Sequence, residues 1–402
     1  MTVLRRTAGV LAATAVIGTA TPATTALAAG TSPSPSASAV LPSGLYGSSD
    51  PKFDGVWRQS LALLAQRAVG LTPAAKAVDW LAGQQCANGS FAAFRADPAA
   101  ACDAKVAVDT NSTAAAVQAL KAAGGHDAAA DKAVTWLKSQ QNKDGGWGYT
   151  PGSASDTNST GVVIGALAAA GESADRSPYD LLAKWSIPCA EDGGGALAYQ
   201  PDKQGKLAAN ADATAAGVLG ALGRGFVTTA GKAPAKGYAC ADSDQALTRE
   251  EVARNGAAYL GDATSATGHL VSTLPGAKPQ PDYGNTADAV VAMAAQGWTK
   301  PAKKPYAWLE AHAVPWAEQS GPAAYAELIL AAHAMGADPR DFGGTNLVTA
   351  LNATGPAPRT AAAKHTEEKK SGSSVWWIVG TGLVAGIGIG FLLSGRRKQQ
   401  QL

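Results

Sequence analysis

Charged residues are scarce in this sequence: Asp, Glu, Lys and Arg make up 16% of its 402 positions, whereas 46% are hydrophobic. Basic residues also form no cluster in the central part of the chain. Once Arg5, Arg6 and the basic residues of 396–398 are set aside, acidic residues slightly outnumber basic ones. Because a nucleic-acid partner requires basic groups that neutralise phosphates, we expect none. The low charge and the abundant alanine and glycine suit tightly packed helices.

Long uncharged runs are confined to the two ends of the chain. Residues 1–28 have the pattern of a secretory signal peptide, with two arginines, an apolar run and a small-x-small cleavage site. Residues 375–393 hold nineteen uncharged residues, which is long enough to cross the hydrocarbon layer, and a basic tail follows at 394–402. Basic residues mark the cytoplasmic side. We therefore expect an exported, single-pass membrane protein with its N-terminal domain outside.

Two polar segments separate these ends from the central chain. Residues 29–49 are rich in proline, serine and alanine, and 354–374 form a second polar tether. Such compositions have little to bury. The sequence therefore predicts one folded domain between residues 50 and 353.

A repeat of about 50 residues runs through this domain. Its clearest unit, 132–160, predicts a helix, a glycine-rich turn closed by Trp147, and a second helix that begins at Asp156. The segment 76–91 repeats the first half with the same spacing. The Asp-Thr-Asn-Ser-Thr that opens 156–171 also opens 109–124. Each unit is therefore a pair of helices.

Six segments share the apolar pattern and the closing glycine of this second helix: 55–70, 109–124, 156–171, 210–225, 282–297 and 321–336. Partner helices are expected near 74–86, 130–141, 178–187, 249–261, 303–313 and 341–352, where Pro188, Gly261 and Pro305 are expected to stop a helix. Six alternating hairpins predict an all-α fold, an (α/α)6 toroid closed into a ring, between the signal peptide and the one C-terminal transmembrane helix.

Only four cysteines are present, and their spacing does not form a zinc site, which requires clustered ligands. In an exported protein four cysteines predict two disulfides, although they allow three pairings. Cys86 and Cys102 flank one turn-to-helix loop and form the natural pair, which leaves Cys189 and Cys240. The second pair requires the connection 226–248 to fold back from the opposite end of the ring.

The repeat also carries a resemblance. Its Lys-Ala-x-x-Trp-Leu-x3-Gln-x3-Gly-x-Trp pattern at 132–147, with a partner at 76–91, resembles the QW repeat of squalene-hopene cyclases and the wider prenyltransferase-like α/α toroid superfamily. The resemblance implies structural roles, in which glutamines bond the carbonyls at a helix end and aromatic rings close the gaps between hairpins. The residues concerned are Trp80, Gln85, Phe91, Trp136, Gln141 and Trp147.

The chemical signatures of these relatives are missing. Class II terpene cyclases use an Asp-x-Asp-Asp motif, and the nearest string, 242–245, is one acid short. The Asp-x-Cys zinc motif of protein prenyltransferases and the Cys-Gly-Glu-Gln of thioester domains are also absent. Glu327 and the isolated His269, His312 and His333 do not share one helical face, as an acid–base pair would require. We therefore assign no catalytic residue and no metal ligand.

The starts of four inner helices form an Asp/Asn-x-x-x-Thr series. This series resembles the inner-helix starts in the α domain of intrinsic factor and transcobalamin, exported toroids that bind corrinoids. The resemblance implies a ligand site at the mouth of the ring, to which nearby tyrosines would add flat apolar contact. The predicted ligand-binding residues are Asp109, Asn111, Thr113, Asp156, Asn158, Thr160, Asn210, Asp212, Thr214, Asp282, Tyr283, Asn285 and Thr286, with Tyr149 and Tyr199.

An alternative explains part of the series without a ligand. Asp and Asn are preferred N-caps of helices, so the first residue of each start can be a cap alone. Asn111, Asn158 and Asp212 lie beyond the cap, where such side chains disfavour a helix, and a polar surface explains them better.

Three functions therefore stay open. The first is capture of a small or medium-sized ligand, with a corrinoid as one candidate, for delivery to an importer. Because no capping β domain follows the ring, a large ligand would lie open or be covered by a capping protein. The second is a diverged toroid enzyme, terpene cyclase-like or active on glycans, which needs paired carboxylates in the cavity. The third is a non-catalytic interaction scaffold at the cell surface.

Overall fold

The computed structural model describes residues 42–103, 105–233, 237–272 and 278–359, which all belong to one compact unit that begins at Leu41. Six inner helices alternate along the chain with six outer ones. The inner helices are α1 (Gly55–Ala68), α3 (Thr110–Ala123), α5 (Thr157–Ala170), α7 (Ala211–Ala221), α9 (Tyr283–Ala295) and α12 (Pro322–Met335). The outer helices are α2 (Ala75–Gly83), α4 (Asp127–Ser139), α6 (Tyr179–Lys184), α8 (Arg249–Ser265), α10 (Thr299–His312) and α13 (Leu347–Ala353).

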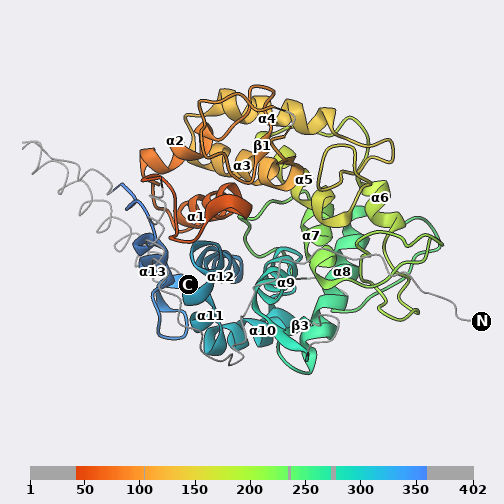
Figure 1. Ribbon diagram of the computed structural model, residues 1–402. Coiled ribbons are helices and arrows are strands. Elements are labelled where there is room, and N and C mark those ends of the chain that lie inside the picture. Colours follow the sequence, from red (N-terminus) through yellow and green to blue (C-terminus); the bar gives the residue numbers. More distant parts are fainter. Residues whose placement is uncertain (1–41, 104, 234–236, 273–277, 360–402) are drawn as a thin grey trace, which may run out of the picture. The chain divides into compact units, whose positions relative to one another are not determined.

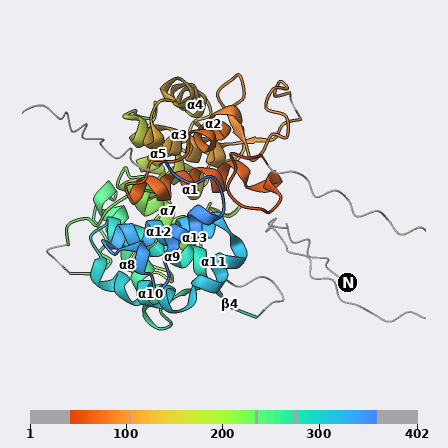
Figure 2. The same cartoon turned by 90° about the vertical axis from the view of Figure 1, so that its left-hand side faces the viewer.

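The inner helices form a closed ring. Each packs against the next inner helix along the chain, and α12 packs back against α1. Figure 1 looks into this ring, with the outer helices at its periphery, and Figure 2 shows it from the side. The described residues therefore form an all-α toroid of six helical hairpins, as the repeat predicts.

Short elements that the sequence did not predict lie at the ends of the hairpins. They are the helix α11 (Val314–Ser320), the 3-10 turns η1 (Pro51–Phe53) and η2 (Pro339–Asp341), and two antiparallel strand pairs, β1 (Phe91–Ala92) with β2 (Val108–Asp109) and β3 (Leu270–Ser272) with β4 (Gln280–Asp282). Both strand pairs lead into an inner helix, α3 or α9, and fix where that helix begins.

Small residues let the inner helices approach closely. A Cβ atom at Gly161 of α5 would collide with the backbone carbonyl of Ala216 in α7, and one at Gly217 would lie 2.6 Å from the side chain of Leu197. Alanine is the most frequent residue at the other buried positions of these helices. Because the glycines cost the helices conformational entropy, close packing between neighbours is the physical reason for their presence.

The QW-type repeat ties successive hairpins together. Gln141 Nε2 donates to the carbonyls of Gly145, at 2.7 Å, and Arg176, at 2.9 Å, and Gln85 Nε2 makes the equivalent bonds to Gly89 and Ala129. The Trp147 ring is fully buried, as is the Phe91 ring at the matching position. Trp136 is also buried, and Trp80 stacks on Phe94. Each glutamine therefore links a helix end to its own turn and to the next hairpin.

Several predicted helix boundaries are wrong. Helices α8 and α10 continue through Gly261 and Pro305, which were expected to end them. Helix α7 ends at Ala221 rather than near residue 225, because Gly223 adopts a positive φ of 63° and Arg224 N bonds back to the carbonyl of Leu219. The closing glycine of this repeat is Gly223, and the chain has left the helix before Gly225.

The folded unit extends further than predicted at both ends. Leu45 and Tyr46, assigned to the 29–49 linker, are buried in the core, and the Tyr46 hydroxyl donates to the carbonyl of Pro356 at 2.6 Å. Arg359 N donates to the carbonyl of Thr72 at 2.8 Å. Residues 45–49 and 354–359 therefore pack together and join the two ends of the ring.

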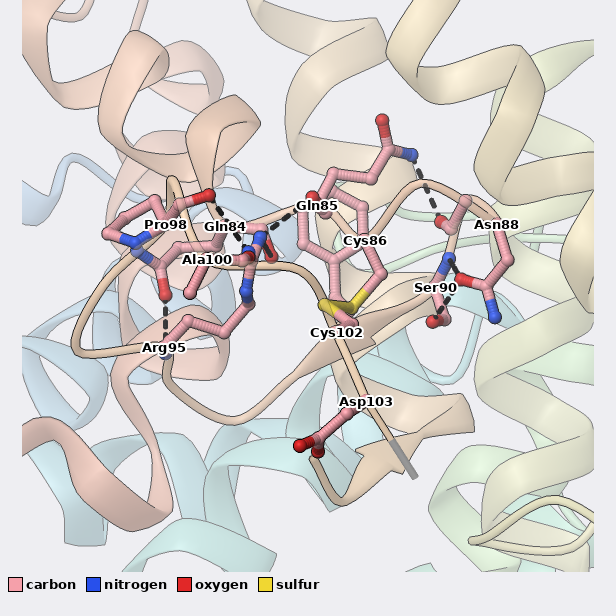
Figure 3. Close-up of a disulfide and its surroundings, with 12 residues drawn as sticks. Gln84, Gln85, Cys86, Asn88, Ser90, Arg95, Pro98, Ala100, Cys102 and Asp103 are labelled. Carbon is pink, nitrogen blue, oxygen red and sulfur yellow. Dashed lines mark hydrogen bonds between the residues drawn. A yellow bond between two sulfur atoms is a disulfide. The ribbon is translucent and has the colours of Figure 1, made fainter. Parts of the chain in front are cut away.

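Both predicted disulfides are present. Cys86 and Cys102 are bonded, with their Cα atoms 5.6 Å apart. Figure 3 shows the loop that they close, in which the buried Arg95 guanidinium donates to the carbonyls of Gln85, at 2.9 Å, and Pro98, at 2.8 Å. One arginine thus satisfies loop carbonyls that no helix or strand could pair.

Cys189 pairs with Cys240, with Cα atoms 5.8 Å apart. The connection between α7 and α8 folds back to the Cys189 loop, as this pairing requires. Cys189 N donates to Asp242 Oδ1 at 2.9 Å, and Asn255 Nδ2 of α8 donates to the carbonyl of Ala241 at 3.0 Å.

The predicted signal peptide, 1–28, the transmembrane helix, 375–393, and the basic tail, 394–402, lie outside the described residues. None of the helices in the part of the chain that the structure describes has the length and apolar character needed to span a membrane.

Candidate functional site

A cavity of about 270 Å³ lies on the axis of the ring. All six inner helices contribute to its wall, together with the segment that follows α7. Its wall is mainly aliphatic and aromatic, with a smaller set of polar side chains. The polar residues are Asn111, Gln118, Asn158, Asp212, Arg224, Asp288 and Glu327.

Asn111, Asn158 and Asp212 line this cavity from α3, α5 and α7, each two residues past its N-cap. Asn158 Nδ2 donates to Asp212 Oδ2. The Oδ1 atoms of Asn111 and Asn158 are buried and have no hydrogen-bond partner. Since buried polar atoms are nearly always paired, these two acceptors are open to a hydrogen-bond donor in the cavity.

Two further acids complete the polar wall. Asp288 of α9 and Glu327 of α12 each lie six residues past the N-cap, one turn deeper than the asparagines of α3 and α5. In α9 the position two residues past the cap is Gly284. A Cβ atom there would lie 3.3 Å from Glu327 Oε2, so the glycine leaves room for this carboxylate.

These carboxyl groups perturb one another. Burial raises the pKa of Asp288 to about 7, and the charges of Asp212 and Asp282 add to the effect. Burial, followed by the charges of Asp288, Asp282 and Asp212, raises the pKa of Glu327 well above its usual range. The pKa of Asp212 is also raised, mainly by burial, against the opposing hydrogen bond from Asn158. Such a group titrates as a unit and retains protons near neutral pH.

No basic side chain is among the causes of these pKa shifts. Asp288 and Glu327 are half-buried, and each lines both the axial cavity and a second hollow beside α9 and α12. Arg224, the one basic residue in the cavity wall within the described ranges, donates to Thr228 Oγ1 at 2.9 Å and to the carbonyl of Thr229 at 3.1 Å. Arg224 therefore shares the wall with the acids, but within the described residues it forms no ion pair with them.

The segment after α7 closes the end of the cavity near the C-termini of the inner helices. In Figure 1 it is the green chain that runs inside the ring. The Phe226 ring packs edge-on against Trp57, with centroids 5.5 Å apart, and Phe226 N donates to Gln118 Oε1 at 2.9 Å. Gln118 is itself buried. The protein's own hydrogen bonds therefore hold this segment, and the Phe226 ring reaches from it to Trp57, which lies three residues past the N-cap of α1.

The other end opens beside α9 and α12. A second hollow there shares Asp288 and Glu327 with the axial cavity and is also lined by Asp282, Asn285, Tyr283 and Trp316. The Tyr283 ring is stacked between Trp308, at 5.0 Å, and Trp316, at 5.5 Å. We call this hollow the entrance. Its aromatic wall is rigid, because both faces of Tyr283 are covered.

The cap and threonine residues of the predicted series bond to the backbone. Asp109, Asp156, Asn210 and Asp282 each accept from the backbone N–H three residues later, as N-caps do. The four threonines are fully buried, and each hydroxyl accepts from the backbone N–H of the preceding loop at 2.9–3.0 Å. These threonines are Thr113, Thr160, Thr214 and Thr286. Their hydroxyls attach each turn to its inner helix.

The remaining predicted residues do not gather at one place. Tyr149 is 49% exposed and lines a separate hollow beside the Cys86–Cys102 loop. Tyr199 is 42% exposed and lies beside Asp156, outside the lining of the axial cavity. Asn285 donates to Asp282 Oδ2 at 2.8 Å, at the entrance. Of the predicted series, the axial cavity brings together Asn111, Asn158 and Asp212.

Sequence reasoning missed Asp288 and treated Glu327 only with His333, which lies in another hollow. The missed signal is helical periodicity. If residues two past the cap face the axis, residues six past the cap face it too, because positions four apart share one face of a helix. Asp288 and Glu327 occupy that second position.

A comparison with protein families matches residues 108–174, which carry α3, α4 and α5, to the squalene-hopene cyclase C-terminal domain. A search of curated proteins found no match. The match supports the toroid fold of the prenyltransferase and cyclase superfamily. It includes Asn111 and Asn158 but ends before Asp212, Asp288 and Glu327.

The carboxyl groups do not form a metal site. Within the described residues, no group of three or more His, Cys, Asp or Glu side chains is arranged to hold a metal ion.

Proposed function

We propose that the toroid binds a small ligand in its axial cavity, on the outer side of the membrane. The observation that carries this proposal is the pair of buried, unpartnered acceptors, Asn111 Oδ1 and Asn158 Oδ1, in a cavity lined by all six inner helices. Apolar walls with a few convergent polar groups are typical of ligand pockets.

The cavity volume limits the size of the ligand. At about 270 Å³ it lies near the lower end of ligand pockets, which span roughly 300–1,000 Å³. A corrinoid macrocycle is wider than this space, so that ligand could be held only at the entrance. Titration of the full chain with cobalamin tests the corrinoid prediction separately.

The proposed location outside the cytoplasm rests on features other than the cavity. Two disulfides suit an oxidising compartment outside the cytoplasm, and residues 1–28 and 375–393 have the composition of an export signal and an anchor. A tethered binding domain could pass its ligand to an importer in the same membrane. Trypsin accessibility of the domain on intact cells tests this location.

An acid–base enzyme that uses the same cavity is the second candidate. The raised pKa values of Asp288 and Glu327 favour it, because a carboxylic acid that is protonated at neutral pH can act as a general acid. A binding protein would release its ligand unchanged, whereas an enzyme would release a product. Mass spectrometry of recovered ligand distinguishes the two.

The test of the binding proposal fills the cavity. Val162 of α5 lines the cavity, whereas Ala169 of the same helix is exposed. Water-soluble fragments that bind the full-length protein are first selected from amines, alcohols, carboxylic acids and monosaccharides. Val162→Trp should abolish their binding. Ala169→Trp is the matched control and should bind them normally. Equal fragment binding to both variants would place the ligand site elsewhere.

A further inference from the structure

Three carboxyl groups gather in the axial cavity, where Arg224 is the one basic residue of the described wall. Asp212, Asp288 and Glu327 come from three inner helices and face one space. Within the described residues none of them forms a salt bridge. Enclosing carboxylates without an ion-pair partner costs free energy. A cationic ligand would offset this cost.

The unpartnered amides of Asn111 and Asn158 restrict the ligand in a second, independent way. Asn111 Oδ1 and Asn158 Oδ1 are acceptors, so only a group that carries hydrogen-bond donors can pair with them. An anion would meet like charges and supply few donors. A bare metal ion would supply none, and the acids are not arranged to hold one.

Polarity changes along the axis. The acids and amides lie two and six residues past the helix caps, toward the N-terminal end of the inner helices. The next level, nine residues past the caps, is mainly apolar. It includes Leu219, Val291 and Leu330.

We propose that the ligand of the axial cavity is a compact organic ammonium ion. Its nitrogen lies among the three carboxyl groups and donates to the asparagine Oδ1 atoms, while its apolar body extends toward Leu219, Val291 and Leu330. This inference rests on the proposed function and gives the chemical class of its ligand. A neutral polyol could also donate to the asparagines, but it would leave the carboxylates without a counter-charge.

Binding of a cation should release protons. The raised pKa of Asp288, to about 7, means that this group holds a proton for part of the time at neutral pH. An ammonium ion beside it lowers the pKa again. Affinity for the cation should therefore rise by at least about tenfold from pH 5 to pH 8, whereas affinity for a neutral ligand should not change.

The experiment compares two probes of nearly equal shape, benzylammonium and benzyl alcohol, by isothermal titration of the full chain near pH 8. Benzylammonium should bind at least about tenfold more tightly. Asp288→Asn with Glu327→Gln should remove this preference. Asp175→Asn with Glu191→Gln changes the net charge equally at two exposed positions and should leave the preference intact.

The outcomes separate the two proposals. If benzyl alcohol binds as tightly as benzylammonium and Val162→Trp abolishes both, the ammonium inference is overturned and the binding proposal stands. If glucose binds and benzylammonium does not, the ammonium inference is also overturned, and the ligand class is a polyol. If no fragment depends on Val162, both proposals fail. If the variant with Asp288→Asn and Glu327→Gln does not fold, the affinity of the unaltered protein for benzylammonium can still be measured against pH. An affinity that does not change from pH 5 to pH 8 contradicts the ammonium inference.

Discussion

The carboxyl cluster makes a direct prediction about stability. Asp288→Asn keeps the size of the side chain and removes its charge. In the folded protein the pKa of Asp288 is raised from 3.8 to about 7, so the folded state holds this proton more tightly than the unfolded chain does. The associated stability is fully present below about pH 4 and is lost as the pH rises through about 7. Asparagine has no such dependence, and the variant should gain stability relative to the unaltered protein as the pH rises.

The magnitude follows from the pKa difference. Each pKa unit corresponds to about 1.4 kcal/mol, so a rise from 3.8 to about 7 sets an upper limit of about 4 kcal/mol. We expect about 1–3 kcal/mol, because water in the cavity screens the charge and Glu327 redistributes the remaining protons.

Urea unfolding of the full chain near pH 5 and near pH 8 measures this effect. The change in the free energy of unfolding caused by Asp288→Asn should be more stabilising at the higher pH. Asp175→Asn, at an exposed position, should show no such difference. If Asp288→Asn changes the free energy of unfolding equally at both pH values, the pKa of Asp288 is not raised in the folded protein. That result would refute the prediction.

Three further predictions concern the repeat and the disulfides. Thr160→Val leaves the buried N–H of Trp147 without its acceptor and should lower the free energy of unfolding by about 1–3 kcal/mol in urea titrations; no loss would mean that water replaces the hydroxyl. Trp147→Ala removes a fully buried ring and its bond to Leu137 and should cost about 3–5 kcal/mol in the same assay, so a cost below about 1 kcal/mol would contradict its packing role. Replacing Cys189 and Cys240 by serine opens a loop of 51 residues and should lower stability by about 2–4 kcal/mol; a loss below about 1 kcal/mol would contradict this role of the disulfide.

The fold could be predicted because its local signals repeat. Asp109 and Asp156 cap helices that begin where the repeated motif places them, and Gly124 and Gly171 end the same helices with positive φ angles. Where one copy departed from the pattern, the prediction failed. The copy that forms α7 has two glycines near its end, Gly223 and Gly225. The repeat pattern predicts Gly225 as the closing glycine, but the backbone turns at Gly223.

The candidate site was only partly predictable, for a different reason. The asparagine positions stand out because Asn111 and Asn158 recur at one place in the repeat. The matching positions of α3, α5 and α7 carry Ala115, Val162 and Ala216, so no recurrence marks Asp288 and Glu327. Their significance depends on the packing of successive inner helices, which places α7, α9 and α12 side by side and lets the charge of Asp212 act on both acids.

The ring therefore separates two kinds of sequence constraint. The caps and buried threonines hold each turn on its helix, and they are nearly the same in α3, α5, α7 and α9 because every hairpin faces the same geometric problem. The axis-facing positions differ from helix to helix: amides on one side, acids on the other, and Gly284 where a side chain would press on Glu327. Packing alone would have allowed alanine at all of these positions. Divergence of the axial surface within a repeated frame is what a ligand site requires, and it favours the proposal that the ligand binds in the cavity rather than on the outer face of the toroid.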